Sequence, residues 1–194
     1  MEQCYDKPIW TLQHLLRALP GLPARLRHMP RLGGALRERI MLAVAVENRC
    51  RYCQLAHTTF GRAAGLSADE VQAIVDDEEL AQLQPGERAA VAYVRDLARR
   101  NFASPSPDLR RQLSMHFDEE SVQAIEGAAH LMNLANRLGN TFDALLARLV
   151  RRCDRSGAGW ADLALLSPLF MLGAAAVAPS VGALSLWHWL KGGA

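Results

Sequence analysis

The chain has 194 residues, half of them apolar, and a formal net charge of +2. This length and composition predict one sizeable packed domain with at most an appendage, and they exclude an intrinsically disordered chain. The small net charge and the scattered arginines give no basis for nucleic-acid binding.

Helical periodicity of apolar residues runs through almost the whole chain, and no alternating β-branched run predicts a strand. Proline, glycine and capping residues divide this pattern into separate helices. In chain order, we expect helices over residues 9–19, 22–29, 35–47, 50–64, 67–76, 85–101, 107–116 and 118–149. The sequence therefore predicts an all-α protein.

The composition changes after Gly157-Ala158-Gly159, which separates a core from an apolar tail. We expect three parts: an N-terminal helical arm (1–34), a core domain (35–150) and an apolar C-terminal extension (151–194).

The extension carries one formal charge between residues 160 and 190, at Asp162. Its length would permit a membrane span, and flanking arginines and the Trp187–Trp189 cluster would suit a membrane interface. However, Pro168 and Pro179 divide the run into pieces that we expect to be too short to cross. We therefore favour a helical hairpin that packs on the core or in a subunit interface.

Cysteine usage and the start of the sequence indicate the compartment. Four cysteines are too few for a secreted scaffold held by disulfides. The first six residues lack the basic and apolar regions of a secretory signal, so we expect a cytoplasmic protein. In a reducing compartment, a Cys-x-x-Cys pair is more often catalytic, redox-active or metal-binding than structural.

Such a pair is present at Cys50 and Cys53, followed by His57. If Cys50 starts a helix, the unsatisfied amides of the first turn and the helix dipole stabilise a thiolate there. The spacing puts both sulfurs on one side of the helix, close enough for a disulfide. His57 lies one turn beyond Cys53 on the same face, where it could accept the Cys53 proton.

An acid on the preceding helix could complete a proton path. Glu38 lies twelve residues before Cys50, and its carboxylate could approach His57 or the cysteines if the two helices pack antiparallel. Glu47, three residues before Cys50, could take the same role. The sequence does not choose between these two acids.

A zinc site is the main alternative for the cysteine pair. Zinc would need two more ligands, and only His57 is well placed, because His116, His130 and Cys153 follow no familiar spacing. We therefore disfavour zinc. Cys153 and the isolated Cys4 are interpreted as ordinary thiols.

A polar stripe follows one side of the long helix 118–149. It consists of His130, Asn133, Asn136 and Arg137. These residues either line the site opposite the cysteine helix or form an exposed or inter-subunit face. We favour the second interpretation.

The segments around residues 36–40, 50–57 and 64–66 resemble the alkylhydroperoxidase D (AhpD)-like branch of the carboxymuconolactone decarboxylase superfamily. The shared pattern is Glu, eleven residues, Cys-x-x-Cys, three residues and His, followed by Gly-Leu. The segment Asn133–Leu138 is similar to the Asn-Arg helix of this group. The resemblance covers about residues 35–150.

This resemblance implies an all-helical homo-oligomer, commonly a trimer or hexamer, with no metal or organic cofactor. Cys53 would attack a hydroperoxide to give a sulfenic acid, and Cys50 would resolve it to a disulfide. Glu38 and His57 would form the proton relay. A dithiol, from a thioredoxin-like or lipoyl reductant, would then reduce the disulfide.

Tyr52 is a departure from the pattern, because AhpD has a histidine at that place. A phenol, with a pKa of about 10, is a poorer proton carrier at pH 7 than imidazole. The decarboxylase branch lacks the Cys-x-x-Cys pair, so lactone decarboxylation is disfavoured. The leading hypothesis is a thiol-dependent peroxidase or disulfide oxidoreductase. The alternative is a non-enzymatic redox sensor or adaptor whose dithiol switches the oligomer.

Overall fold

The computed structural model describes residues 5–78, 80–150 and 157–192, and these ranges contain helices but no β-strand. In chain order the helices are α1 (Leu12–Ala18), α2 (Leu22–Leu26), α3 (Gly34–Glu47), α4 (Arg51–Ala63), α5 (Ala68–Val75), α6 (Pro85–Arg99), α7 (Pro107–Ser114), α8 (Glu119–Leu149) and α9 (Trp160–Gly192). Two single-turn 3-10 helices, η1 (Leu19–Gly21) and η2 (Met29–Arg31), flank α2. The all-α prediction is confirmed.

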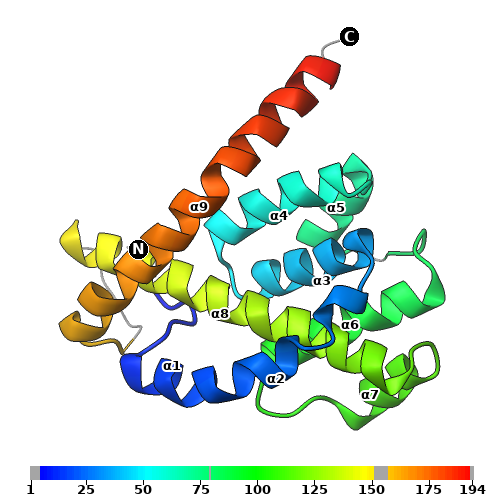
Figure 1. Ribbon diagram of the computed structural model, residues 1–194, viewed down its shortest axis with the longest axis horizontal. Helices are drawn as coiled ribbons and strands as arrows, with labels where there is room; N and C mark the ends of the chain where they lie inside the picture. The colour runs from blue at the N-terminus through cyan, green and yellow to red at the C-terminus, as the bar shows by residue number, and fades with distance from the viewer. Residues whose placement is uncertain (1–4, 79, 151–156, 193–194) are drawn as a thin grey trace.

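Helix α8 is the central element of the fold (Figure 1). It packs against α2, α3, α4, α6, α7 and α9. Its buried side includes Val122, Ile125, Ala129 and Met132, which join the main core with side chains of α3, α5 and α6. Other buried residues of α8 are small, among them Ala124, Gly127, Ala128 and Gly139, and the neighbouring helices therefore approach α8 closely.

The N-terminal arm is fixed to α8 by a backbone contact. Gly127 of α8 faces α2, and a Cβ atom added at Gly127 would collide with the carbonyl oxygen of Arg25. The absence of a side chain at Gly127 therefore allows α2 to lie directly on α8. The division into arm, core and extension stays a prediction.

In the described part of the C-terminal extension, residues 160–192 form one helix, so the expected hairpin is wrong. Helix α9 continues through Pro168 and Pro179. A proline removes one backbone hydrogen bond and bends a helix, but an otherwise apolar run can continue on both sides of the bend. The expected division into short pieces therefore does not occur.

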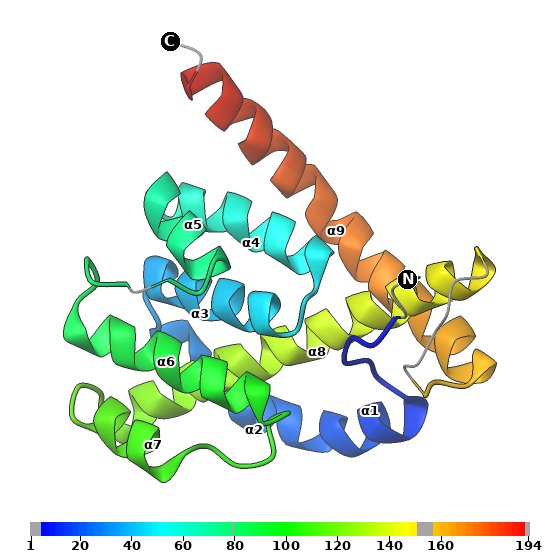
Figure 2. The ribbon, with the colours of Figure 1, turned by 180° about the vertical axis from the view of Figure 1, so that it is seen from behind.

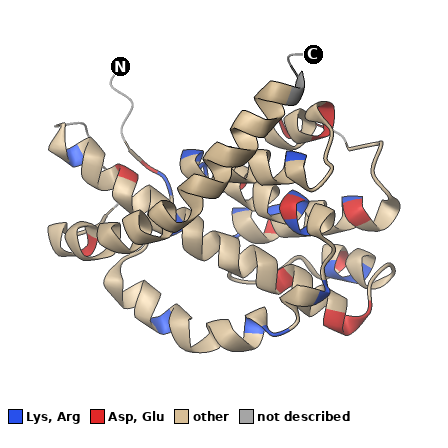
Figure 3. Cartoon of the chain, turned by 45° about the horizontal axis from the view of Figure 1, so that its top comes forward, with Lys and Arg blue, Asp and Glu red and all other residues tan. Residues whose placement is uncertain are grey.

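The start of α9 packs on α8, α4 and α1, where Leu163, Leu166 and Ser167 are buried. Beyond these residues the helix projects from the body of the protein (Figures 1 and 2). The projecting part carries no charged residue before Lys191 (Figure 3). By length and composition, α9 could cross a membrane, and none of its most apolar 18-residue window is buried.

Candidate active site

The two cysteines lie at the N-terminal end of α4. Cys50 is the N-cap residue, with an extended backbone (φ −87°, ψ 97°). The preceding residue, Arg49, has a φ of 54°, and this left-handed conformation turns the chain sharply between α3 and α4. The two Sγ atoms are 2.6 Å apart, and both thiols are free and buried. This geometry requires little movement to form a disulfide.

The two thiols have opposite pKa shifts. The hydrogen bond with Cys53 lowers the pKa of Cys50, and the backbone amides of Cys53 and Tyr52 lower it further, although burial acts in the opposite direction. The hydrogen bond with Cys50 and burial raise the pKa of Cys53. When the pair loses a proton, the negative charge therefore lies on Cys50 and the remaining proton on Cys53.

Helices α8 and α9 cover Cys50. A Cβ atom added at Gly139 of α8 would lie 2.9 Å from the Cys50 Sγ and 3.1 Å from the ring of Phe170 in α9. The Phe170 ring also packs on Tyr52, with 5.1 Å between centroids. Cys50 has no exposed surface, whereas Cys53 is 7% exposed. Substrate from solvent therefore reaches Cys53 more directly than Cys50.

Glu38 and His57 meet between α3 and α4. The His57 Nδ1 is 2.7 Å from a carboxylate oxygen of the buried Glu38. Among the described residues, His57 makes this hydrogen bond and none to a cysteine sulfur. Since His57 follows Cys53 by four residues on α4, its ring lies one turn beyond that sulfur on the same face.

The structure shows which of the two candidate acids, Glu38 or Glu47, contacts His57. The Glu47 carboxylate accepts hydrogen bonds from the Arg99 guanidinium at 2.7 and 2.9 Å. Arg95 lies 3.8 Å from the same carboxylate. Of the two acids, it is Glu38 that contacts His57.

A sequence model of the carboxymuconolactone decarboxylase family matches residues 10–96, a range that contains Glu38, both cysteines and His57. Two crystal structures share the fold. One is a protein of unknown function from Agrobacterium tumefaciens, described as a candidate antioxidant defence protein AhpD, with a TM-score of 0.57 and 22% identity over 68% of this chain and 89% of that chain. The other is the alkylhydroperoxidase AhpD core of an uncharacterized peroxidase-related protein from Ralstonia eutropha, with a TM-score of 0.52 and 23% identity over 67% of this chain and 69% of that chain.

Residues 10–96 of the chain are therefore similar to the carboxymuconolactone decarboxylase family. The fold of the chain is AhpD-like. A comparison with curated proteins finds no match.

In this AhpD-like protein, the Tyr52 hydroxyl belongs to a charged cluster. It accepts a hydrogen bond from Arg51 at 2.8 Å and donates one to Asp143 of α8 at 3.3 Å. Lys7 binds the other Asp143 oxygen at 2.9 Å. Burial raises the pKa of Tyr52, so the phenol stays neutral at pH 7. Its hydroxyl is thus bonded to this cluster, away from the Glu38–His57 pair.

The sequence did not reveal Gly139, Asp143 or Phe170 as neighbours of the cysteines. All three lie far along the chain and reach the site only through the packing of α8 and α9.

The polar stripe of α8 is not an exposed face, so the favoured interpretation is wrong for its two asparagines. Asn133 and Asn136 are buried. The Asn133 side-chain oxygen accepts from the Asn48 side-chain amide at 3.2 Å, and the Asn136 side-chain amide donates to the Val44 backbone carbonyl oxygen at 3.1 Å. These bonds fix α8 to the turn that carries Cys50.

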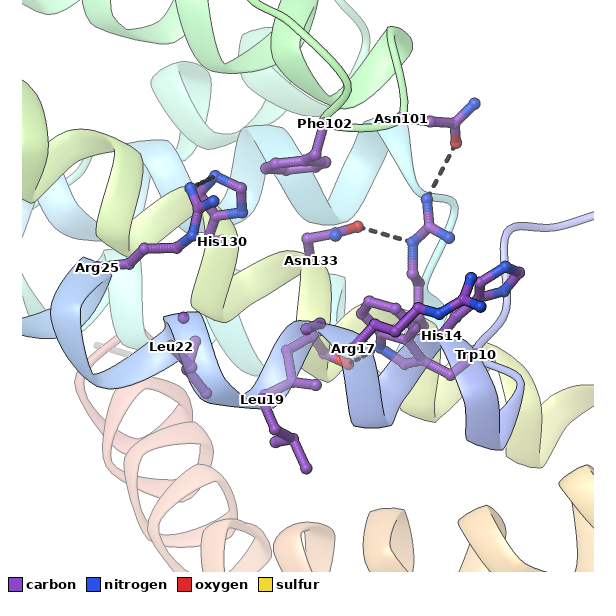
Figure 4. A pocket seen from close by; sticks show the side chains of 14 residues that line it. Trp10, His14, Arg17, Leu19, Leu22, Arg25, Asn101, Phe102, His130 and Asn133 are labelled. Atoms are coloured by element: carbon purple, nitrogen blue, oxygen red, sulfur yellow. Dashed lines mark hydrogen bonds between the residues drawn. The ribbon is translucent and has the colours of Figure 1, made fainter.

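The other two members of the stripe, His130 and Arg137, line a cavity beside the N-terminal arm (Figure 4). Within the described residues, no group of three or more His, Cys, Asp or Glu side chains is placed to hold a metal ion. Cys4 and Cys153 lie outside the described residues.

Proposed function

We propose that the protein is a thiol-dependent peroxidase or disulfide oxidoreductase that reduces hydroperoxides through Cys50 and Cys53. The main support is the buried pair of sulfurs 2.6 Å apart at the start of α4, with the thiolate stabilised on Cys50. The AhpD-like fold is consistent with this chemistry. A homo-oligomer of three or six subunits stays a prediction.

The first step is attack on the peroxide by Cys53, the more exposed sulfur. Proton transfer from Cys53 to the Cys50 thiolate, across 2.6 Å, produces the Cys53 thiolate. This thiolate attacks the distal oxygen of the hydroperoxide, and the O–O bond breaks. Cys53 becomes a sulfenic acid, and the alkoxide leaves as an alcohol with a proton from the imidazolium of His57.

The second step closes the disulfide. The Cys50 sulfur attacks the Cys53 sulfur, and the sulfenic hydroxyl leaves as water with the Cys50 proton. The two electrons that reduce the peroxide come from the two sulfurs. Glu38 remains a carboxylate and orients the His57 ring. An external dithiol then reduces the disulfide by exchange.

Peroxide-dependent oxidation of a dithiol by the purified full chain tests this function. We expect Cys53→Ser to abolish turnover. We expect Cys50→Ser to stop turnover but to leave a Cys53 sulfenic acid that a dimedone probe can trap. Cys153→Ser is the matched control and should turn over normally. Wild-type turnover by Cys53→Ser would rule out the mechanism.

The contact of Phe170 with the cysteine site supports a second candidate function. Because the Phe170 ring lies against the space beside Cys50, disulfide formation could alter the packing of α9. The protein would then act as a redox sensor. A redox-dependent change in oligomer mass, combined with negligible peroxide turnover, would favour this function over catalysis.

A further inference from the structure

A cavity of about 470 Å³ lies between the N-terminal arm and α8. At about 100° per residue along a helix, the α8 residues that line it face away from Gly139 and therefore away from Cys50. Figure 4 shows Trp10, Leu19 and Leu22 from the arm, and Phe102 and His130 across the cavity. This volume is typical of a small-molecule site.

The lining is cationic. It contains three arginines (Arg17, Arg25 and Arg137) and two histidines, with no Asp or Glu. None of the three arginines forms an ion pair with a carboxylate of the described residues. A cluster of guanidinium groups without a counter-charge favours binding of an anion.

Arg137 is the half-buried member of this cluster, whereas Arg17 and Arg25 are exposed. Its guanidinium donates to the side-chain oxygens of Asn133 and Asn101, both at 3.0 Å, and to the Ile9 carbonyl oxygen at 3.4 Å. It also lies over the Trp10 ring, 5.2 Å from the centroid. All these partners are neutral. A guanidinium has five N–H groups, so two remain for a ligand.

Arg25 forms the opposite wall. Its guanidinium is 2.6 Å from the His130 Nε2. Burial and the Arg25 charge lower the pKa of His130 to about 4. At neutral pH the His130 ring is therefore uncharged and accepts this hydrogen bond, and Arg25 keeps its charge without a carboxylate partner.

The rest of the lining is apolar, with Trp10, Leu19, Leu22, Phe102 and Leu134 among its members. We propose that this cavity binds an amphipathic anion, with a carboxylate or phosphate group on Arg137 and Arg25 and an apolar body against Trp10 and Phe102. The site is separate from the cysteine pair and does not depend on the proposed redox function.

Calorimetric titration of the full chain with octanoate, octanamide and inorganic phosphate tests this site. We expect octanoate to bind at least ten-fold more tightly than the other two. Arg137→Gln and Arg25→Gln should each weaken octanoate binding ten-fold or more. Arg25 is exposed, so its replacement should leave the fold intact. Arg31→Gln, in the same arm but paired with Glu120, is the matched control and should bind normally.

Equal binding of octanamide would exclude an anion site. Equal binding of phosphate would exclude an amphipathic ligand. Unchanged octanoate binding by both Arg25→Gln and Arg137→Gln would overturn the assignment.

An independent observation concerns the projecting part of α9. Its exposed large apolar residues include Leu169, Met171, Leu172, Val177, Leu186 and Leu190. At about 100° per residue, these positions fall on all sides of the helix. A protein partner would cover one side and leave the others in water, whereas lipid contacts every side.

The dimensions and ends of this segment also fit a bilayer. Residues 169–190 extend about 33 Å at 1.5 Å per residue, and the hydrocarbon core of a bilayer is about 30 Å thick. Trp187 and Trp189 lie near the far end, as interfacial aromatic residues do. Four arginines at 148, 151, 152 and 155 precede the helix, and one lysine follows the segment.

We propose that α9 spans a lipid bilayer from Leu169 to Leu190 and tethers the helical domain to the membrane. The excess of arginines before the helix places that domain on the cytoplasmic side. Phe170, at the start of the span, contacts the cysteine site, so Cys50 and Cys53 lie close to the membrane surface. This tether does not depend on the redox chemistry.

Fractionation of cells that express the full chain with a C-terminal tag tests the tether. We expect the protein to stay in the membrane pellet after sodium carbonate extraction, with the tag protected from protease in inside-out vesicles, whose lumen would contain the C-terminus. Leu172→Arg combined with Val177→Arg should move most of the protein to the soluble fraction. Leu16→Arg combined with Leu55→Arg, at equally exposed positions outside α9, is the matched control and should stay in the pellet.

A wild-type chain that is soluble without detergent, including as an oligomer of this chain, would overturn the tether. Carbonate-resistant binding with a digested tag would exclude the span. Cooperative thermal unfolding of the arginine variant verifies that its helical domain is folded.

Discussion

The Nδ1 of His57 and a carboxylate oxygen of Glu38 lie 2.7 Å apart, although the residues come from different helices. Since a carboxylate only accepts hydrogen bonds, the proton of this bond is on Nδ1. This fixes the ring and directs Nε2 away from Glu38. The pair is thus arranged to deliver a proton from a fixed position.

Replacement of this acid gives the first prediction. Glu38→Gln keeps the shape but removes the charge that stabilises the imidazolium of His57. We expect peroxide turnover to fall by about 100-fold, as for loss of a general acid–base group.

Glu47→Gln is the matched control, since Glu47 binds Arg99 instead. It should affect thermal stability more than turnover. An equal loss of turnover in both variants would show that the identity of the acid does not matter.

The second prediction concerns the Cys50 thiolate. The pKa of Cys50 is lowered below its ordinary value of 9.0, first by the hydrogen bond with Cys53. Cys53→Ala removes that bond, so the Cys50 pKa should rise. Thiolate absorbance at 240 nm, followed during a pH titration, measures both values. A Cys50 pKa that stays the same in Cys53→Ala would contradict the shared-proton arrangement.

This shift also predicts how stability depends on pH. The Cys50 thiol has a lower pKa in the folded protein than in the unfolded chain. Its contribution to the free energy of unfolding is therefore fully present at a pH above the unfolded pKa. It is lost as the pH falls through the lowered folded pKa. Urea unfolding of the reduced protein should show this loss, and Cys50→Ser should remove it.

The third prediction tests the covering of Cys50. Gly139→Ala would place a Cβ atom 2.9 Å from the Cys50 Sγ and 3.1 Å from the Phe170 ring. We expect it to destabilise the protein by about 1–3 kcal/mol and to slow disulfide formation. Gly173→Ala, in α9 with no neighbouring atom within 4 Å, is the control and should be neutral or slightly stabilising. Thermal unfolding and the rate of thiol loss after peroxide addition distinguish the two variants.

The fourth prediction concerns the attachment of the arm. Gly127→Ala would force the Arg25 backbone away from α8. Because backbone atoms cannot rotate away, we expect a loss of about 3 kcal/mol in the free energy of unfolding. Octanoate binding in the cavity should weaken as well. Gly34→Ala, which meets no atom within 4 Å, should change neither quantity. Normal octanoate binding by Gly127→Ala would show that the cavity does not need α2 in its observed place.

The sequence was a good guide where the deciding interactions are local. Apolar periodicity located the helices. The sequence Ser67-Ala68-Asp69-Glu70 also predicts a capping box and Asp118 a helix cap, and in the structure Ser67 accepts from the Glu70 amide and Asp118 from the Ser121 amide. The return bond from the Glu70 carboxylate to the Ser67 amide, which a capping box also predicts, does not form, because this carboxylate pairs with Arg39 of α3. That pairing depends on tertiary packing, which periodicity does not encode.

At the candidate site, too, local relationships were predictable from the sequence and tertiary contacts were not. Cys50, Cys53 and His57 share one helix, so their common face followed from spacing alone. Buried asparagines on α8 were interpreted as exposed because their partners, such as the Val44 carbonyl oxygen, belong to a helix more than ninety residues away along the chain. The continuity of α9 through two prolines likewise had no local signal.

The Phe170 ring beside Cys50 has a consequence for the direction of thiol exchange. A reductant the size of a protein cannot reach the Cys50 sulfur while that ring and α8 cover it, so an incoming thiolate must attack Cys53. The bond then breaks with Cys50 as the departing thiolate, which the backbone amides of Cys53 and Tyr52 stabilise. The Phe170 ring thereby determines which of the two disulfide sulfurs the reductant attacks.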